Sequence, residues 1–176
     1  HPAGLVLIDE VDRMLIDVGQ EGDPILLAQA RTKNYPDSKI GIFSTPTIEG
    51  ISPIWRYYEN GTMGKWEWPC PHCNAYFVPE FKHLHWPENE TPENALYTTR
   101  LVCPSCGAEI ESHEKGAMNA AGRYLFHVKQ GDKLEPVGNE PPRNPTASYW
   151  VSGICSPWQT FGEIANVMLT ALRSRN

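Results

Sequence analysis

Residues 5–14 read LVLIDEVDRM, and this stretch decides the fold class. A run of four apolar residues before two acids is typical of a short strand that is covered on both faces, as in the parallel sheets of α/β proteins. The run ends directly on two carboxylates, Asp9 and Glu10. Ligands of parallel sheets bind at the carboxyl ends of the strands, so we expect both acids to lie at a functional edge.

The residues that follow predict a βαβ unit. Asp23 can cap a helix that begins at Pro24 and ends before Pro36. Residues 40–43 then form a second buried strand, and a strand, helix and strand with short connections predict a parallel, right-handed arrangement. We expect the apolar face of the helix to consist of Leu26, Leu27 and Ala30.

The acids at the end of the first strand have two interpretations. A nucleoside triphosphatase needs one carboxylate to hold Mg²⁺ and a second to orient the attacking water. A strand that leaves the core into a solvated turn also often carries acids. The second strand ends on STPT, where the hydroxyls of Ser44, Thr45 and Thr47 could contact a γ-phosphate or the water beside it. The motif alone is an ordinary turn, but together with the acids it favours the nucleotide site.

Two C-x-x-C pairs predict a four-thiolate zinc site. In each pair a proline follows the first cysteine, and Asn74 or Gly107, which tolerate a left-handed backbone, follows the second. Four thiolates leave no coordination position open, so we expect a structural zinc that stabilises a segment with little core. The four cysteines are Cys70, Cys73, Cys103 and Cys106.

The spacing between the pairs is longer than in common zinc ribbons, so we expect two hairpins separated by a loop at residues 85–94. The nearby histidines could replace a thiolate, but we favour surface or packing roles for them: His72, His83, His85 and His113. Aromatic residues interspersed with lysines could stack on nucleic acid, but a small metal-stabilised core needs them too, and we favour the core. They are Trp66, Trp68, Tyr76, Phe77, Phe81 and Trp86.

The remaining residues predict a strand at 122–130, a polar, proline-rich linker at 131–145 and a strand at 147–154. Cys155 is expected to be a buried thiol at the end of that strand. A C-terminal helix follows, and its apolar stripe is expected to pack in the core. The stripe consists of Phe161, Ile164, Ala165, Met168 and Leu172.

Composition excludes several classes of protein. The chain has 176 residues, 40% of them hydrophobic, and no apolar run long enough to span a bilayer, so we expect no membrane association. The formal net charge is −6, so any contact with nucleic acid must be local. An odd number of cysteines, five, with C-x-x-C pairs fits a reducing compartment and a metal better than a disulfide framework.

Five ordered motifs, LVLIDEVDRM, SKIGIFSTPTIEGISPIW, WPCPHCNAYF, LVCPSCGAEI and ASYWVSGICSPWQTFGEI, resemble the large terminase subunit of lambda-like tailed bacteriophages over nearly the whole chain. The resemblance implies a P-loop ATPase of the additional-strand catalytic-glutamate class that moves DNA into a procapsid, followed by an RNase H-like nuclease. It also implies the working context: double-stranded DNA, a small terminase subunit, a portal, a ring of subunits and the cytoplasm of the bacterial host.

The same resemblance implies roles for individual residues. Asp9 matches the Walker B aspartate that coordinates Mg²⁺, and Glu10 matches the catalytic glutamate. Ser44, Thr45 and Thr47 match the motif that couples ATP hydrolysis to DNA movement.

The sequence also departs from that family, because these 176 residues contain no G-x-x-x-x-G-K-[ST] motif and no nuclease carboxylate cluster. The chain begins almost directly on a strand, so we expect it to be a fragment of a longer protein. Because the phosphate-binding motif is missing, we expect negligible ATPase activity from the fragment alone. An incomplete sheet should also expose one edge and an apolar face. Its expected parts are the second half of the ATPase core (1–62), the zinc-ribbon insertion (63–121) and a segment that leads to the nuclease (122–176). Two alternatives stay open: another zinc-ribbon helicase or translocase, and a zinc-stabilised nucleic-acid or protein-binding module without catalysis.

Overall fold

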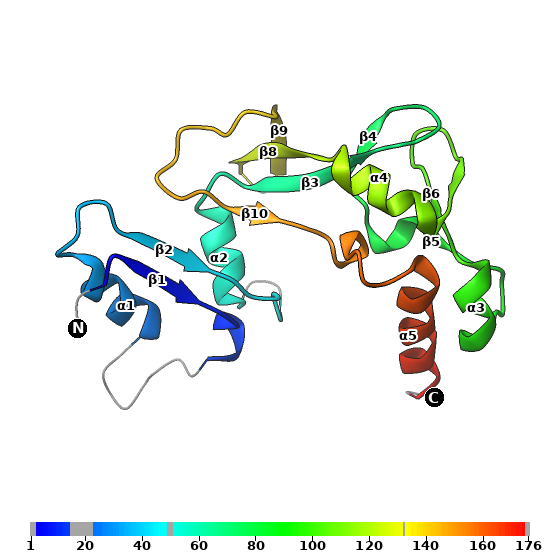
Figure 1. Cartoon of the computed structure of the whole chain (residues 1–176), viewed down its shortest axis with the longest axis horizontal. Coiled ribbons are helices and arrows are strands. Elements are labelled where there is room, and N and C mark those ends of the chain that lie inside the picture. Colours follow the sequence, from blue (N-terminus) through cyan, green and yellow to red (C-terminus); the bar gives the residue numbers. More distant parts are fainter. Residues whose placement is uncertain (1–2, 15–22, 49–50, 132, 175–176) are drawn as a thin grey trace. The chain divides into compact units, whose positions relative to one another are not determined.

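The computed structural model describes residues 3–14, 23–48, 51–131 and 133–174. The chain divides into two compact units, residues 1–61 and residues 62–176 (Figure 1). The second unit contains both the expected insertion and the segment that follows it. Among the described residues, no helix is long and apolar enough to cross a membrane.

The first unit is built around a parallel pair of strands. Strands β1 (Leu5–Ile8) and β2 (Lys39–Ile42) pair in parallel, with Ile8 opposite Ile42. Helix α1 (Pro24–Thr32) connects them and begins as expected, because the side chain of Asp23 accepts a hydrogen bond of 2.8 Å from the backbone N–H of Ile25. The 3-10 turn η1 (Val11–Arg13) follows β1, and helix α2 (Pro53–Glu59) closes the unit.

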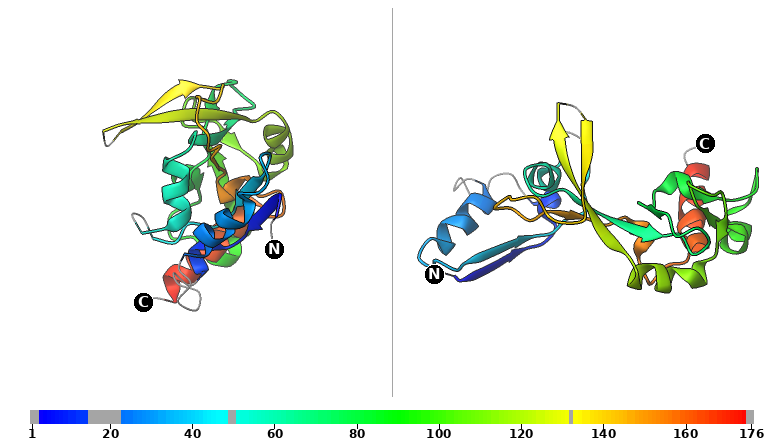
Figure 2. Two further views of the ribbon diagram at one scale, coloured as in Figure 1. Left: turned by 90° about the vertical axis from the view of Figure 1, so that its left-hand side faces the viewer. Right: turned by 90° about the horizontal axis from the view of Figure 1, so that it is seen from above.

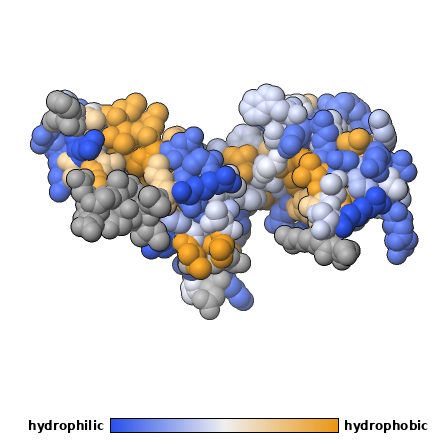
Figure 3. Space-filling model, turned by 90° about the horizontal axis from the view of Figure 1, so that it is seen from below, coloured by the Kyte–Doolittle hydropathy of each residue, from blue (hydrophilic) through white to orange (hydrophobic). Residues whose placement is uncertain are grey.

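Among the residues that the structure describes, only one face of the β1–β2 pair is covered, which corrects the expectation of a strand buried on both faces. Ile8 and Ile25 lie in the core, whereas the side chains of Leu5 and Leu7 are 60% and 64% exposed. Figure 3 shows this hydrophobic exposure in the first unit, drawn on the left. The expected face of α1 is also wrong, since Leu26 is exposed and Ile25 packs instead.

The second unit contains a sheet centred on strand β3 (Gly64–Pro69). Strand β8 (Arg123–Gln130) pairs antiparallel on one side of β3, and β10 (Tyr149–Trp150) pairs in parallel on the other. Strand β9 (Lys133–Gly138) extends the sheet as a hairpin with β8 (Figure 2), and β4 (Tyr76–Phe77) pairs with the end of β3.

Two predictions for this part of the chain need correction. The expected linker at residues 131–145 contains β9, which takes its hydrogen bonds as an edge strand on β8 and therefore tolerates Pro136. The expected strand at 147–154 shortens to β10 and gives way to the 3-10 turn η4 (Gly153–Cys155), which the side chain of Ser152 caps. Cys155 is buried, as expected, but in a turn and not in a strand.

A smaller antiparallel sheet consists of β5 (Leu84–His85), β6 (Arg100–Val102) and β7 (Glu109–Ile110). The expected loop at residues 85–94 is interrupted by helix α3 (Pro92–Thr98), whose N-terminus is capped by Thr91. The remaining helical elements of the second unit are η2 (Phe81–His83), η3 (Ser112–Glu114), α4 (Lys115–Ala120) and α5 (Phe161–Arg173).

The core of the second unit joins the cysteine-rich segment to the C-terminal segment. Trp68 is fully buried, and its indole N–H donates a 2.8 Å hydrogen bond to the side chain of Asn119. Asn119 in turn donates a 2.9 Å hydrogen bond to the backbone oxygen of Cys155. The cluster consists of Trp68, Cys70, Phe77, Leu84, Leu101, Cys103, Ile110, Met118, Ile154, Cys155 and Phe161. The segment around the cysteines therefore has more core than expected, and residues 154–161 supply part of it.

Helices α3 and α5 approach so closely at Gly162 that a side chain does not fit. A Cβ atom at this position would lie 2.1 Å from the backbone oxygen of Leu96. A second contact fixes the two helices, because Asn166 on α5 donates a 2.7 Å hydrogen bond to the backbone oxygen of Pro92 on α3. The small residue at position 162 thus decides how α5 docks.

The Gly162→Ala variant should therefore lower the stability of the second unit. The obstructing atoms belong to the backbone and cannot rotate away, so overpacking should cost about 1–3 kcal/mol of the free energy of unfolding. Thermal unfolding of the chain, followed by tryptophan fluorescence, measures the effect. Gly116→Ala is the matched control: it lies on α4 with nothing within 4 Å of an added Cβ, so it should leave the melting temperature unchanged or slightly raised. Equal melting temperatures for both variants would contradict the close approach.

Candidate functional site

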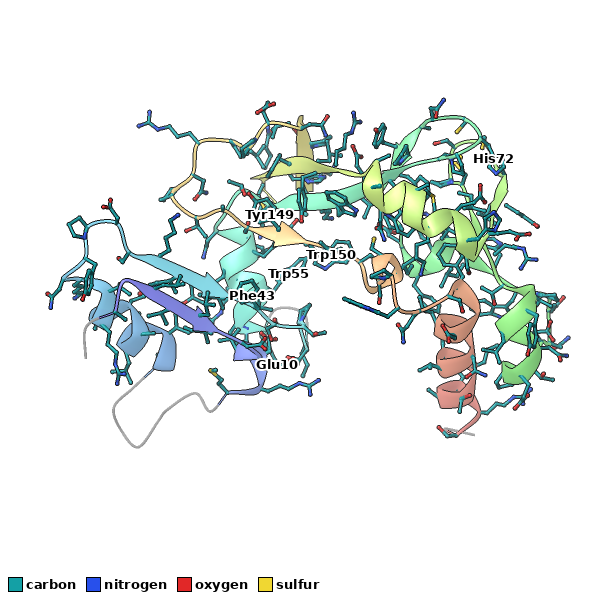
Figure 4. The ribbon with its side chains drawn as sticks, in the orientation of Figure 1. Glu10, Phe43, Trp55, His72, Tyr149 and Trp150 are labelled. Atoms are coloured by element: carbon teal, nitrogen blue, oxygen red, sulfur yellow. The ribbon has the colours of Figure 1, made fainter. Side chains whose placement is uncertain are left out.

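The structure places Asp9 and Glu10 directly beyond the carboxyl end of β1 (Figure 4). Both residues are exposed. The pairing of the two strands continues up to the acids, because the backbone N–H of Phe43 donates a 2.8 Å hydrogen bond to the carbonyl oxygen of Ile8. The acids and the first residues after β2 therefore emerge side by side at one edge of the parallel pair.

Glu10 has an unusual backbone conformation. Its φ of 56° and ψ of 39° lie in the left-handed region, which a non-glycine residue adopts at a cost of about 1–3 kcal/mol. Its N–H donates a 2.9 Å hydrogen bond to the carboxylate of Asp9, and its own carboxylate lies 3.2 Å from the guanidinium Nε of Arg13. This turn directs the chain sharply away from the strand and presents two adjacent carboxylates to solvent.

A third acid, Asp12, connects this turn to the segment after β2. One carboxylate oxygen of Asp12 accepts hydrogen bonds of 3.0 Å from both the backbone N–H and the hydroxyl of Thr47. The other oxygen accepts a 2.9 Å hydrogen bond from the backbone N–H of Ile54, in the first turn of α2. The N–H of Asp12 donates a 3.1 Å hydrogen bond to the hydroxyl of Ser44.

These hydrogen bonds act on the ionisation of Asp12. Burial alone would raise the pKa of its carboxyl group, but the hydrogen bonds donated by Ser52, Ile54 and Thr47 outweigh burial and lower the pKa below its ordinary value. Asp12 is therefore held as an anion. Sequence reasoning assigned it no role, and the signal was weak: an acid two residues after the pair, with partners 35 and 42 residues away.

The three hydroxyl residues of the STPT segment take different positions. Ser44 and Thr47 are both hydrogen-bonded to Asp12, which brings them next to the turn that carries Glu10. The side chain of Thr45 is exposed, and its backbone oxygen accepts a 3.3 Å hydrogen bond from the hydroxyl of Ser44. The structure thus brings together Asp9, Glu10, Asp12, Ser44 and Thr47 at one edge of the first unit.

The second unit contains a separate cluster of four cysteines. The Sγ atoms of Cys70, Cys73, Cys103 and Cys106 all lie within 4.8 Å of one another, and two of the separations, Cys70 to Cys106 and Cys73 to Cys103, are 3.9 Å. A disulfide would need about 2.05 Å. In a tetrahedral site with Zn–S bonds of about 2.3 Å, the sulfur atoms are about 3.8 Å apart, so this donor set fits zinc in both chemistry and spacing.

The two cysteine pairs share one backbone geometry. In each pair the N–H of the first cysteine binds the carbonyl of the alanine five residues on, at 2.9 Å, and the N–H two residues after the first cysteine points at its sulfur, at 3.4 Å. Asn74 and Gly107 occupy the same place in the two turns with φ of 58° and 73°. The prediction that both residues are left-handed is confirmed.

The thiols of the cluster do not all ionise readily without a cation. Burial raises the pKa of the Cys70 thiol to about 12. At Cys103, burial acts in the same direction, but the hydrogen bonds from the N–H groups of Cys106 and Ser105 outweigh it and lower the pKa to about 7. Four thiolates this close repel one another, so a bound cation is needed for all of them to ionise.

The histidines and most aromatic residues near the cysteines have other roles. Among the described residues the metal-binding group contains cysteines alone, and His72 (Figure 4) lies exposed on the first turn. His83 accepts a hydrogen bond from the N–H of Glu80. Trp68 and Phe77 are buried, Trp66 and Trp86 are partly buried against the core, and Tyr76 and Phe81 are exposed. Tyr76 also stacks on the guanidinium group of Arg123, 3.6 Å from the ring centre.

Comparison with known proteins identifies one family. The model of the family described as "Phage terminase large subunit gpA, ATPase domain" matches residues 1–124, which include the acid edge of the first unit and all four clustered cysteines. Neither the curated proteins nor the solved structures give a significant match.

Proposed function

Because this chain belongs to the ATPase-domain family of phage terminase large subunits of the gpA type, we propose that it supplies the hydrolytic edge of an ATP-driven motor that packages viral DNA. The observation that carries the proposal is the arrangement of Asp9 and Glu10. Both carboxylates lie at the carboxyl end of β1, and Asp12 joins them to the STPT segment.

Each acid has a distinct role in the proposed reaction. Asp9 would hold Mg²⁺, directly or through water, and the metal would neutralise charge on the phosphates of ATP. Glu10 would orient the attacking water and accept its proton, as a general base next to the nucleophile. Ser44 and Thr47, which are both hydrogen-bonded to Asp12, would pass a change at the γ-phosphate to the rest of the domain.

The cysteine cluster has a structural role in this proposal. Its four sulfur atoms would hold one zinc ion in a closed, tetrahedral site, which leaves no position for a substrate. The buried residues packed around Cys70 and Cys103 make the metal part of the core of the second unit. The zinc therefore stabilises the second unit, which follows Asp9 and Glu10 in the chain.

The phosphate-binding loop has to come from elsewhere in the working enzyme, because the 176 residues contain no Walker A motif. We propose that this chain is part of a longer large subunit. That subunit would supply both the phosphate-binding loop and a nuclease domain that cuts concatemeric DNA. Double-stranded DNA, a small subunit, a portal and neighbouring large subunits of a ring are its proposed partners, in the cytoplasm of the bacterial host.

Two ATPase measurements test the proposal. The complete large subunit should hydrolyse ATP faster when double-stranded DNA is added, whereas the isolated chain should show no turnover above a protein-free blank. The reason is that carboxylates without a phosphate-binding loop do not retain Mg²⁺ and ATP. Turnover by the isolated chain would contradict the assignment of the missing loop. A large subunit without any DNA-stimulated ATPase activity would contradict the motor, and the zinc-stabilised binding module would then be the better account.

A further inference from the structure

We propose that Asp12 is a positioning residue: it fixes Glu10 relative to the STPT segment and to the first turn of α2, so that ATP turnover depends on it although it does not touch the nucleotide. This inference rests on the proposed function. It goes beyond that function because the roles proposed for Asp9, Glu10 and the STPT segment leave Asp12 without one.

Asp12 forms several hydrogen bonds to residues that lie far from it in the sequence. Besides the side-chain hydrogen bond from Ser52, the carboxylate of Asp12 accepts three hydrogen bonds of 2.9–3.0 Å, two from Thr47 and one from Ile54, and all of these donors follow β2 in the chain. Its own N–H donates to the hydroxyl of Ser44. One side chain and its backbone thus bind both ends of the segment that connects β2 to α2.

Asp12 lies only two residues after Glu10. Both residues belong to one tight turn, in which the N–H of Arg13 donates a 2.9 Å hydrogen bond to the carbonyl oxygen of Glu10. Glu10 itself is held in the left-handed region, a conformation that persists only where the surroundings impose it. The contacts of Asp12, together with the 3.5 Å hydrogen bond from the N–H of Val11 to the carbonyl oxygen of Phe43, hold this turn against the neighbouring segment.

The hydrogen bonds around Asp12 require an ionised carboxylate at this position. The oxygen that faces Thr47 accepts from two donors, an N–H and a hydroxyl, and the other oxygen accepts from the N–H of Ile54. An asparagine can present only one oxygen, so its amide group would face at least one N–H donor. The Asp12→Asn variant therefore keeps the size of the side chain and breaks the arrangement.

The experiment is steady-state ATP hydrolysis by the complete large subunit with saturating DNA. Asp12→Asn should lower kcat by about tenfold or more and leave the KM for ATP within about twofold, since a misplacement of about 1 Å at a catalytic group costs up to 10²-fold. Thr47→Val, which removes only the hydroxyl, should lower kcat less. The double variant should be no slower than Asp12→Asn alone, because both changes break the same contact.

Two control variants separate positioning from general destabilisation. Asp37→Asn removes an exposed acid in the turn before β2 and should behave as wild type. Ile25→Val trims a buried core residue of the same unit, so it lowers the melting temperature without touching the Asp12 contacts. The inference is overturned if Asp12→Asn retains wild-type kcat, or if it loses no more kcat than Ile25→Val at an equal loss of melting temperature.

The variant Glu10→Gln in the same assay distinguishes a failure of the inference about Asp12 from a failure of the proposed function. If Glu10→Gln abolishes turnover and Asp12→Asn does not lower it, the proposed function stands and the role of Asp12 is wrong. If Glu10→Gln turns over ATP as fast as wild type, the proposed function itself is wrong, and the inference about Asp12 is wrong with it.

Discussion

We expect Cys70→Ser to abolish the proposed binding of zinc and to unfold the second unit. Cys70 is fully buried, its sulfur lies 3.9 Å from that of Cys106, and the core around it includes Trp68 and Phe161. Structural zinc contributes about 10–16 kcal/mol of apparent binding free energy in zinc-finger peptides, as much as the whole stability of a typical domain, about 5–15 kcal/mol. Loss of one thiolate should therefore remove the metal and most of the cooperative unfolding transition.

Metal analysis and near-ultraviolet circular dichroism test this prediction together. The wild-type chain should contain one zinc ion per molecule, and Cys70→Ser should contain about none and lose the signal of the buried Trp68. Cys155→Ala is the matched control, because it removes the one buried thiol outside the cluster and should retain one zinc ion. An apo-protein with an unchanged spectrum and melting temperature would contradict a structural role for the metal.

The second large effect is expected at Glu10. Glu10→Gln in the complete large subunit should retain ATP binding and lose about 10²–10⁴-fold in kcat, the usual contribution of a general base. Asp9 remains to hold Mg²⁺, so the affinity for ATP should change little. Folding should not be affected, because the ion pair of Glu10 with Arg13 is exposed and such pairs contribute about 0–1 kcal/mol.

The control for Glu10→Gln is Asp37→Asn, which removes one negative charge from another exposed position of the same unit. This variant should keep wild-type kcat. A companion variant, Asp9→Asn, should instead weaken the binding of ATP with Mg²⁺, since it removes the proposed metal ligand. If all three variants turn over ATP equally, the acids form only a solvated turn.

Features with a local cause could be predicted from the sequence. The pair Asp23–Pro24 predicts the start of α1, and the side chain of Asp23 caps this helix as expected; Ser52 and Pro53 begin α2 in the same way. The C-P-x-C turns likewise predicted their left-handed residues. In each case the residues that form the structure are neighbours in the chain, so the pattern contains the information.

Features that depend on distant partners could not be predicted. Asp12 looks like any turn residue until the fold brings Thr47 and Ile54 to it. Strand β9 (KLEPVG) lies in a proline- and glycine-containing stretch that is typical of a loop, and only its partner β8 makes it a strand. Helix α3 is different, because Thr91 followed by proline is an N-terminal helix signal that the loop interpretation overlooked.

The exposure of one face of β1 also could not be predicted from the local sequence pattern. A continuous apolar run predicts a strand buried on both sides, yet Leu5 and Leu7 are exposed while Ile8 is buried. Within the residues described here, α1 covers one face only. The sequence thus indicates how many faces such a strand can bury, and the elements around it determine how many are buried.

A single-turnover experiment shows whether Glu10 activates the attacking water in the hydrolytic step. The Glu10→Gln large subunit, in excess over ATP and with Mg²⁺ and double-stranded DNA present, is quenched at increasing times, and the bound nucleotide is separated into ATP and ADP. This measurement isolates the chemical step from product release. If Glu10 is the general base, the bound nucleotide should stay ATP long after wild type has converted it to ADP. Formation of ADP at the wild-type rate would contradict this role.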